Sequence, residues 1–241
     1  MRRQLVPALV SMLLLTLLLG VGYPLLVTGI AQVGFQHRAD GALVSRNGKP
    51  VGSPLIGQAF VDANGNPIPK YFQSRPSAAT GVNGTTTAGY DPTLSSGSNL
   101  GPSNPKLVAA CLPVPETTKS GKPVLDHAGH PVNQHQSDGS LVCDPTTVPQ
   151  RAKAYRKLNG LRADVAVPVD AVTASASGLD PDISIANARL QAARVGRARH
   201  LSARQVLGVV DAHTSGRTLG FLGEKTVNVL EVNLALDRLT S

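Results

Sequence analysis

Three histidines near the middle of the chain bring together the residue types that could bind zinc. With the carboxylates and the thiol beside them, the set is Asp126, His127, His130, His135, Asp138 and Cys143. Imidazole, carboxylate and thiolate groups all bind zinc, but this spacing matches no closed structural zinc site. We therefore expect a solvated, histidine-rich loop here and no metal site.

Ser103 and Lys106 form a second candidate, because a Ser-x-x-Lys pair supplies the nucleophile of some extracytoplasmic serine hydrolases. That chemistry places the lysine one helical turn after the serine, and Pro105 between them obstructs such a helix. The chain contains no Gly-x-Ser-x-Gly elbow, no Gly-x-x-x-x-Gly-Lys-Ser/Thr loop and no Gly-x-Gly-x-x-Gly turn. Asn83 begins a glycosylation sequon, which is a common chance match. The sequence therefore names no catalytic residue and offers no phosphate cradle.

The element that must position everything else is an apolar stretch over residues 5–31, which contains no charged residue. As a helix it reaches roughly 40 Å, enough to cross a hydrocarbon core of about 30 Å. We therefore predict a transmembrane anchor over residues 1–33. A cleaved signal peptide is the alternative, but its apolar core is only about 7 to 15 residues long. Arg2 and Arg3 precede the span. This charge pattern predicts a protein of the cell membrane with a cytoplasmic N-terminus and an extracytoplasmic domain over residues 34–241.

The composition agrees with one domain of moderate size beyond this anchor. Gly and Pro are frequent (24 and 18 residues), aromatic residues make up 3% of the chain, and tryptophan is absent. The core is therefore expected to consist mainly of Val, Leu, Ile and Ala. The net charge of +8 suits a domain held close to the head groups of membrane lipid. Nucleic acid is not an expected partner, because the basic residues are scattered and few aromatic side chains could stack on bases.

Residues 108–150 have the composition of a turn-rich insertion. The unit x-Gly-x-Pro-Val occurs at residues 120–124 and 128–132, with a looser third copy, and each copy is expected to form a turn followed by a short extended segment. The chain's two cysteines, Cys111 and Cys143, bracket these copies. In an oxidising compartment such a pair is expected to form a disulfide, which stabilises by roughly 3 to 4 kcal/mol on the chain-entropy model.

Two segments before the insertion differ in character. In residues 34–71 short apolar runs alternate with glycine-containing turns, among them Asn64-Gly65-Asn66-Pro67, so we predict β-hairpins. Residues 72–105 are dense in Gly, Ser, Asn and Pro, a composition typical of a flexible loop. We nevertheless expect residues 95–105 to be ordered, by contacts with residues 72–78 or with another protein, because a loop of this length in a compact domain is usually functional if it is not disordered.

The C-terminal part has the periodicity of regular structure. Asp180 and Pro181 are typical of an N-cap and a first helical position, so we predict a helix start there. Its expected apolar stripe is Ile185, Ala186, Leu190 and Ala193, and its expected basic face is Arg189, Arg194, Arg197 and Arg199. Ser202 and Gln205 form a capping box that opens a second helix. Residues 227–236 alternate apolar and polar residues, which predicts a strand that runs into a terminal helical turn and gives an α+β fold overall.

Four segments have a composition that neither an ordinary surface loop nor a hydrophobic core explains. They are GSPLIGQ at residues 52–58, FQSRPSA at 72–78, SSGSNLGPSNP at 95–105 and VPVDAVTASASGLDP at 167–181. Together with residues 191–195 and 227–237, they resemble the C subunit (KdpC family) of the Kdp potassium-transporting P-type ATPase. The resemblance covers residues 1–107 and 160–240 in the family's order. Residues 108–150 depart from it, since the family normally has a short helical connection there.

The resemblance implies a non-catalytic accessory subunit, which is not an enzyme by itself. Its implied partners are a channel-like potassium-binding subunit, an ATP-hydrolysing pump subunit and a small single-span subunit. The family is described as a catalytic chaperone that raises the pump subunit's affinity for ATP. No cofactor is expected to bind this chain tightly, because the complex handles ATP and K⁺. The alternative is a membrane-anchored extracytoplasmic binding protein unrelated to a pump, which predicts a ligand pocket and no stable membrane partner.

The resemblance also implies candidate site residues. Gln191 and Arg194, with Arg197 and Arg199 beside them, are the candidates for nucleotide contact. This role conflicts with the predicted topology, because the pump's nucleotide domain is cytoplasmic whereas the large domain of this chain is predicted to lie outside. On physical grounds we expect the domain to dock on the channel-like subunit at the outer face. The candidate contact residues in the signature loops are Arg75, Ser98, Asn99 and Asn104.

Overall fold

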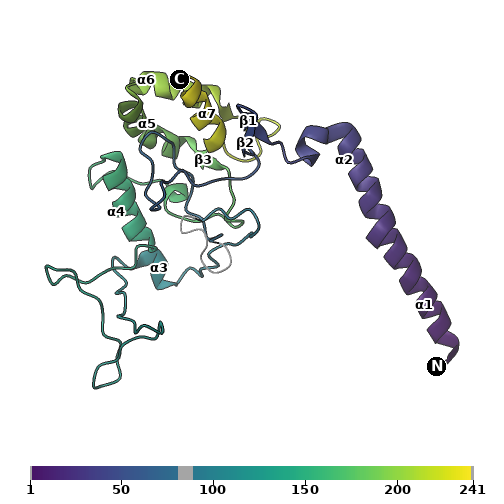
Figure 1. Ribbon diagram of the computed structural model, residues 1–241, viewed down its shortest axis with the longest axis horizontal. Helices are drawn as coiled ribbons and strands as arrows, with labels where there is room; N and C mark the ends of the chain where they lie inside the picture. The colour runs from purple at the N-terminus through teal and green to yellow at the C-terminus, as the bar shows by residue number, and fades with distance from the viewer. Residues whose placement is uncertain (1, 81–88, 240–241) are drawn as a thin grey trace. The chain divides into compact units, whose positions relative to one another are not determined.

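The computed structural model of the protein describes residues 2–80 and 89–239 (Figure 1). Asn83 and its sequon lie outside the described residues. The chain divides into two compact units, residues 1–55 and residues 56–241. The first unit contains the apolar helix and one hairpin, and the second contains the sheet, the core helices and the insertion.

The first unit begins with the predicted apolar helix. α1 (Arg2–Leu17), the π-helical turn η1 (Leu18–Gly22) and α2 (Tyr23–Ala39) follow one another without a break. Within Arg3–Ala39, the mean hydropathy of 18 consecutive residues reaches 2.4, and this helix is long and apolar enough to cross a membrane by length and composition. Its backbone kinks at Phe35 (φ −140°, ψ 31°), close to the predicted boundary at residue 33. The last turns of α2 end at Ala39, before the turn at Asp40-Gly41, where Gly41 has a φ of +83°.

A β-hairpin completes the first unit. β1 (Val44–Arg46) pairs antiparallel with β2 (Lys49–Gly52). The turn residues Asn47 and Gly48 have φ of +53° and +75°, and the tightest hairpin turns require such positive values. The predicted hairpin is confirmed here, whereas residues 34–39 belong to helix α2 instead.

The second unit contains a small antiparallel sheet in the order β3–β5–β4. Helices α5, α6 and α7 share a hydrophobic core with this sheet (Figure 1). The elements are β3 (Asp182–Ser184), α5 (Ile185–Arg199), α6 (Ala203–Ala212), β4 (Thr214–Ser215), β5 (Thr226–Asn228) and α7 (Val229–Leu239). The core contains Phe72, Ile183, Val195, Val206, Val210, Val227, Val232 and Leu236. Valine dominates this core, so the expectation from composition is confirmed. Mixed helices and strands agree with the predicted α+β class.

Helix α5 begins later than the sequence predicts. Ser184 caps it by accepting a hydrogen bond from the Asn187 backbone N–H at 3.1 Å, and the residues just before Ser184 form β3. The predicted start at Asp180 and Pro181 is wrong, because the Asp180 carboxylate forms an ion pair with Arg75 at 2.9 Å instead of capping a helix. The capping box of Ser202 and Gln205 is confirmed at the start of α6.

The buried face of α5 also differs from the prediction. Ala186 and Ala193 are exposed, whereas Asn187, Gln191 and Arg194 are buried. The prediction placed polar side chains outside because water usually satisfies them. Here they are inside because protein backbone and other buried side chains take their hydrogen bonds instead.

The strand predicted over residues 227–236 is wrong beyond residue 228, where α7 begins. Asn228 Oδ1 accepts a hydrogen bond from the Glu231 backbone N–H at 3.2 Å, which satisfies one of the free donors of the helix start. Val229, Val232 and Leu236 then fall on one helical face, and all three are buried.

Residues 56–80 and 89–104 contain no helix or strand, yet hydrogen bonds hold them against the domain. The Gly57 backbone N–H donates to the Leu179 carbonyl, and the Ser96 N–H donates to the Ser177 carbonyl, both at 2.9 Å. The loop at 95–105 is therefore ordered at its beginning, as expected. Its partner within the domain is Ser177 rather than residues 72–78.

The insertion is a three-armed β structure. A closed triangle of backbone hydrogen bonds, with N–O distances of 2.7 to 2.8 Å, joins Glu116, Val124 and Val132. A second triangle, at 2.8 to 2.9 Å, joins Val114, Gln134 and Val142. Three arms leave these triangles, and each is a bridged turn that contains one of the repeated glycines, Gly121, Gly129 and Gly139. The expected turns followed by short extended segments are therefore confirmed.

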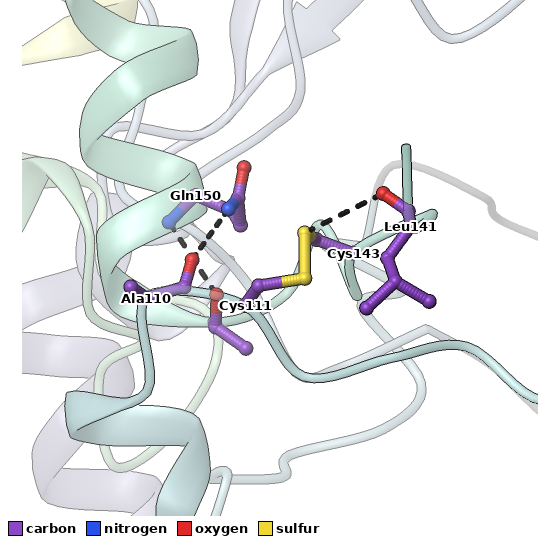
Figure 2. Close-up of a disulfide and its surroundings, with 6 residues drawn as sticks. Ala110, Cys111, Leu141, Cys143 and Gln150 are labelled. Atoms are coloured by element: carbon purple, nitrogen blue, oxygen red, sulfur yellow. Dashed lines mark hydrogen bonds between the residues drawn. A yellow bond between two sulfur atoms is a disulfide. The ribbon is translucent and has the colours of Figure 1, made fainter. Parts of the chain in front are cut away.

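A disulfide between Cys111 and Cys143 closes the base of the insertion (Figure 2). The base lies between two helices, α3 (Pro105–Val108) and α4 (Val148–Asn159). Beside the disulfide, Gln150 Nε2 on α4 donates to the Ala110 carbonyl at 2.6 Å (Figure 2). The disulfide and this hydrogen bond thus lie together at the base of the three arms.

Candidate functional site

Two side-chain amides hold an extended stretch of chain as a neighbouring strand would. Gln191, on α5, accepts from the Gln73 backbone N–H at 2.7 Å and donates to the Gln73 carbonyl at 3.0 Å. Asn233, on α7, does the same for Phe72 at 2.8 and 3.0 Å. Both amides are 1% exposed. We call residues 69–73 the clamped segment, because bonds from both helices fix its backbone.

Arg194 holds the same segment from α5. Its guanidinium donates to the carbonyls of Pro69 and Tyr71, to Asn159 Oδ1 at 2.9 Å and to Gln191 Oε1 at 2.8 Å. Arg194 is 4% exposed, and burial lowers its pKa to about 10, so it still carries its charge at neutral pH. A buried cation depends on such acceptors, because it has lost the water that would otherwise solvate it.

Arg199 makes a third set of contacts with the clamped segment. It donates to the Lys70 carbonyl at 2.7 Å, forms an ion pair with Asp237 at 2.8 Å and lies 5.1 Å from the centre of the Tyr71 ring. A guanidinium over an aromatic face gains a cation–π attraction. Arg197, by contrast, is exposed. The basic residues of α5 therefore divide into two that bind the fold and others that face outward.

A polar network adjoins Gln191. Asp170, in η3 (Val169–Ala171), accepts from the Ser184 backbone N–H and from the Asn187 side chain, at 2.8 and 3.0 Å. Asn187 Oδ1 in turn accepts from Gln191 and from the Tyr155 hydroxyl, at 2.9 and 2.8 Å. A cavity of about 250 Å³ opens beside this network, and its walls include Arg75, Arg151, Tyr155, Asn187 and Gln191.

The distinctive loop segments meet at Gly178. Arg75 Nη1 pairs with Asp180 at 2.9 Å, and the Ser77 hydroxyl donates to the Gly178 carbonyl at 2.6 Å. Gly178 has a φ of +70°, and a Cβ at this position would collide with the Ser96 carbonyl oxygen. Only glycine fits this backbone conformation at so close an approach. The loops that carry the resemblance are therefore packed on one another.

The candidate contact residues have different surroundings. Arg75 is partly buried, and its Nε atom has no hydrogen-bond partner among the described residues. Ser98 and Asn99 are exposed, and Asn99 has a φ of +50°. Asn104 caps α3, since its Oδ1 accepts from the Lys106 backbone N–H at 3.0 Å. Ser98 and Asn99 are thus exposed to solvent, whereas Asn104 stabilises the start of α3.

The hydrolase pair and the histidines do not converge on a reactive site. Lys106 Nζ lies 3.4 Å from the Asp144 carboxylate, and Ser103 precedes the cap of α3. His127, His130 and His135 are exposed on the arms of the insertion. Across residues 2–80 and 89–239, no three His, Cys, Asp or Glu side chains gather closely enough to hold a metal.

Sequence reasoning missed Asn233, although helical spacing carries a signal for it. Asn233 follows Val229 by four residues and precedes Leu236 by three, so it falls on the apolar face of a helix. The alternating pattern led to a strand instead and hid this position. A buried amide flanked by apolar residues at helical spacing is a sign of a side chain that binds backbone.

The sequence matches the protein family described as K⁺-transporting ATPase, c chain, over residues 5–153 and 133–238. The chain belongs to this KdpC family. It is 47% identical to the potassium-transporting ATPase KdpC subunit of Mycobacterium bovis, over 99% of this chain and 100% of that protein. Proteins of the same name from Methylibium petroleiphilum and Caulobacter vibrioides are each 44% identical, over 98% and 96% of this chain and 98% and 91% of theirs.

Membership in the KdpC family confirms the resemblance seen in the sequence, and the match also covers residues 108–150, where a departure was expected. The chain is a subunit of the Kdp potassium-transporting ATPase, has an accessory role in that pump and is not catalytic by itself. Its apolar N-terminal helix agrees with a membrane-associated pump subunit.

Proposed function

We propose that this KdpC chain acts from outside the cell, where its domain docks on the channel-like, potassium-binding subunit of the pump. The observation that carries the proposal over the nucleotide contact implied by the family is the burial of Gln191 and Arg194. Both side chains are bonded to the clamped segment and to each other, so neither is free to meet a nucleotide. A role as a catalytic chaperone for the ATP-hydrolysing subunit then acts through the assembled complex rather than through direct contact with ATP.

The charge pattern of the N-terminus supports the outer location. Arg2 and Arg3 lie just before the uncharged residues 5–31, and positive charge at one end of a span favours the cytoplasmic side for that end. The residues after the helix then lie outside. This topology separates the domain from the cytoplasmic nucleotide domain of the pump subunit by the whole membrane.

The outward-facing loop residues are the proposed contacts. Ser98 and Asn99 are exposed at the tip of a loop whose beginning is bonded to Ser177, so docking would meet a surface that is already ordered. Arg75 and Asn104 stabilise neighbouring parts of that surface. Arg75 does so through its ion pair with Asp180, and Asn104 does so by capping α3. The small single-span subunit completes the proposed complex.

A free-standing binding protein is the competing interpretation, and the cavity beside Gln191 is the observation that favours it. The cavity measures about 250 Å³. Pockets for small ligands usually measure about 300 to 1,000 Å³. Membership in the KdpC family, rather than the size of any cavity, favours the pump subunit over a ligand carrier.

Assembly tests the proposed function. A tagged full-length chain, expressed with the other Kdp subunits and purified in mild detergent, is expected to bring the channel-like and pump subunits with it. Omission of this chain is expected to abolish potassium-stimulated ATP hydrolysis in the remaining subunits. If the chain purifies alone, and the other subunits hydrolyse ATP equally well without it, the proposal is wrong.

A further inference from the structure

A short hairpin between β4 and β5 exposes apolar side chains at its end. Thr218 and Leu222 exchange two backbone hydrogen bonds, each with a length of 2.9 Å. Leu219 is 79% exposed, Phe221 is 68% exposed and Leu222 is 49% exposed. We call residues 218–222 the apolar tip. Three large apolar side chains on one braced turn form an exposed patch of the kind that marks an interaction site.

The backbone of the apolar tip is strained at Leu219. Leu219 and Gly220 have φ of +54° and +83°. In the β1–β2 hairpin of the same chain, the two corresponding turn positions are Asn47 and Gly48, at +53° and +75°. Asn tolerates this conformation because its short polar side chain bonds the local backbone, whereas leucine has only the steric cost.

Asn or Gly at position 219 would therefore give a more stable turn than leucine does. The leucine costs conformational energy and, at 79% exposure, gains almost no burial in return. A contact with a second molecule would supply the burial that Leu219 lacks within this chain.

The charges beside the tip favour a protein partner over a lipid surface. Arg217 donates to both oxygens of the Glu224 carboxylate, at 3.1 and 3.0 Å, so its charge is paired. Lys225 is the only other charged residue between Gly216 and Thr226. Loops that bind anionic lipid carry clusters of unpaired Lys and Arg. A nearly neutral tip that is apolar and stiff instead fits an apolar pocket in a protein.

We propose that the apolar tip inserts into an apolar pocket on the channel-like subunit of the Kdp pump, with Leu219 and Phe221 as its anchors. This inference rests on the proposed function, because it requires the chain to be assembled with that pump. The hairpin hydrogen bonds and the Arg217–Glu224 pair hold the anchors in place before binding, which lowers the entropic cost of docking.

The test uses co-purification of the full-length tagged chain with the other Kdp subunits. A double variant, Leu219→Asn and Phe221→Ser, is expected to reduce the recovery of those subunits by about tenfold or more, as loss of buried interface anchors does. The single variant Leu219→Asn is expected to unfold at the same temperature as the wild-type chain or a higher one, because it relieves the strained turn. Leu125→Asn, at an exposed leucine (55%) of the insertion, is the matched control and is expected to leave recovery unchanged.

The outcomes separate the two claims. If the wild-type chain recovers the other subunits and the double variant recovers them equally well, the tip is not a docking site, although the proposed function stands. If the wild-type chain recovers none of them, both claims are wrong. Because the chain has no tryptophan, Phe221→Trp adds a single fluorescent probe. Quenching of this probe by brominated anionic lipids in nanodiscs that hold the chain alone would assign the tip to the membrane and overturn the proposal.

Discussion

Replacement of Arg194 by methionine is expected to lower the free energy of unfolding of the domain by about 4 kcal/mol. The substitution keeps the apolar volume but removes the donors that now reach the carbonyls of Pro69 and Tyr71 and the side chains of Asn159 and Gln191. The buried Asn159 side chain and the Pro69 carbonyl would lose this donor, whereas Gln191 Oε1 and the Tyr71 carbonyl would keep the hydrogen bonds from Gln73. Thermal unfolding of the full-length chain in mild detergent, followed by circular dichroism, measures the loss.

Arg197→Met is the matched control for this prediction. It makes the same chemical change three residues later on α5, at an exposed position, and is expected to leave the unfolding temperature almost unchanged. A nucleotide site would give a different pattern, in which Arg194→Met folds normally and only the response to ATP is lost. An Arg194→Met chain with wild-type stability would therefore contradict a structural role for this residue.

Replacement of Gly178 by alanine is expected to destabilise the domain by about 3 kcal/mol. The added Cβ would collide with the Ser96 carbonyl oxygen, and the φ of +70° disfavours any residue with a Cβ. The loops that meet at Gly178 must then move apart, which breaks the hydrogen bond from Ser77 and the one between Ser96 and Ser177. Chemical denaturation of the full-length chain measures this effect, and hydrogen exchange at Ser96 locates it.

Gly139→Ala is the control that separates the cost of backbone strain from the cost of a steric collision at the added Cβ. Gly139 has a φ of +80°, but nothing lies within 4 Å of the position that an added Cβ would take, so only the backbone strain applies there. Its expected cost is about 1 kcal/mol. Equal losses at Gly178 and Gly139 would show that the loops are not packed as closely as described.

Local signals in the sequence predict the local elements well. The apolar span gives the N-terminal helix, the Asn47-Gly48 turn gives the first hairpin, and Ser202 with Gln205 gives the start of α6. Each of these depends on neighbouring residues alone. The repeats of the insertion belong to the same class, because each copy forms its own turn.

The start of α5 and the identity of α7 could not be predicted in this way. Asp180 has the residue type of a helix cap, but Arg75, far away in sequence, binds its carboxylate. Val232, Leu234 and Leu236 alternate as in a strand, but Asn228 supplies a helix start and Val229, Val232 and Leu236 share one buried face. In both places tertiary contacts override the local pattern.

The same limit applies to the candidate site. Gln191 and Arg194 have residue types that suit a nucleotide phosphate, and nothing near them in sequence reveals that the backbone of residues 69–73 takes their hydrogen bonds. Their partners lie more than a hundred residues earlier in the chain. A polar side chain on a helix therefore indicates the capacity to bind, and only the fold shows what is bound.

Whether this KdpC chain acts from outside the cell is decided by the side of the membrane on which its large domain lies. Lys119 and Lys122 are exposed on one arm of the insertion, where an amine-reactive, membrane-impermeant reagent can reach them. In intact spheroplasts that express the full complex, we expect both lysines to be labelled while a cytoplasmic control protein is not. Labelling of Lys119 and Lys122 only after the spheroplasts are lysed would place the domain in the cytoplasm and contradict the proposed outer location.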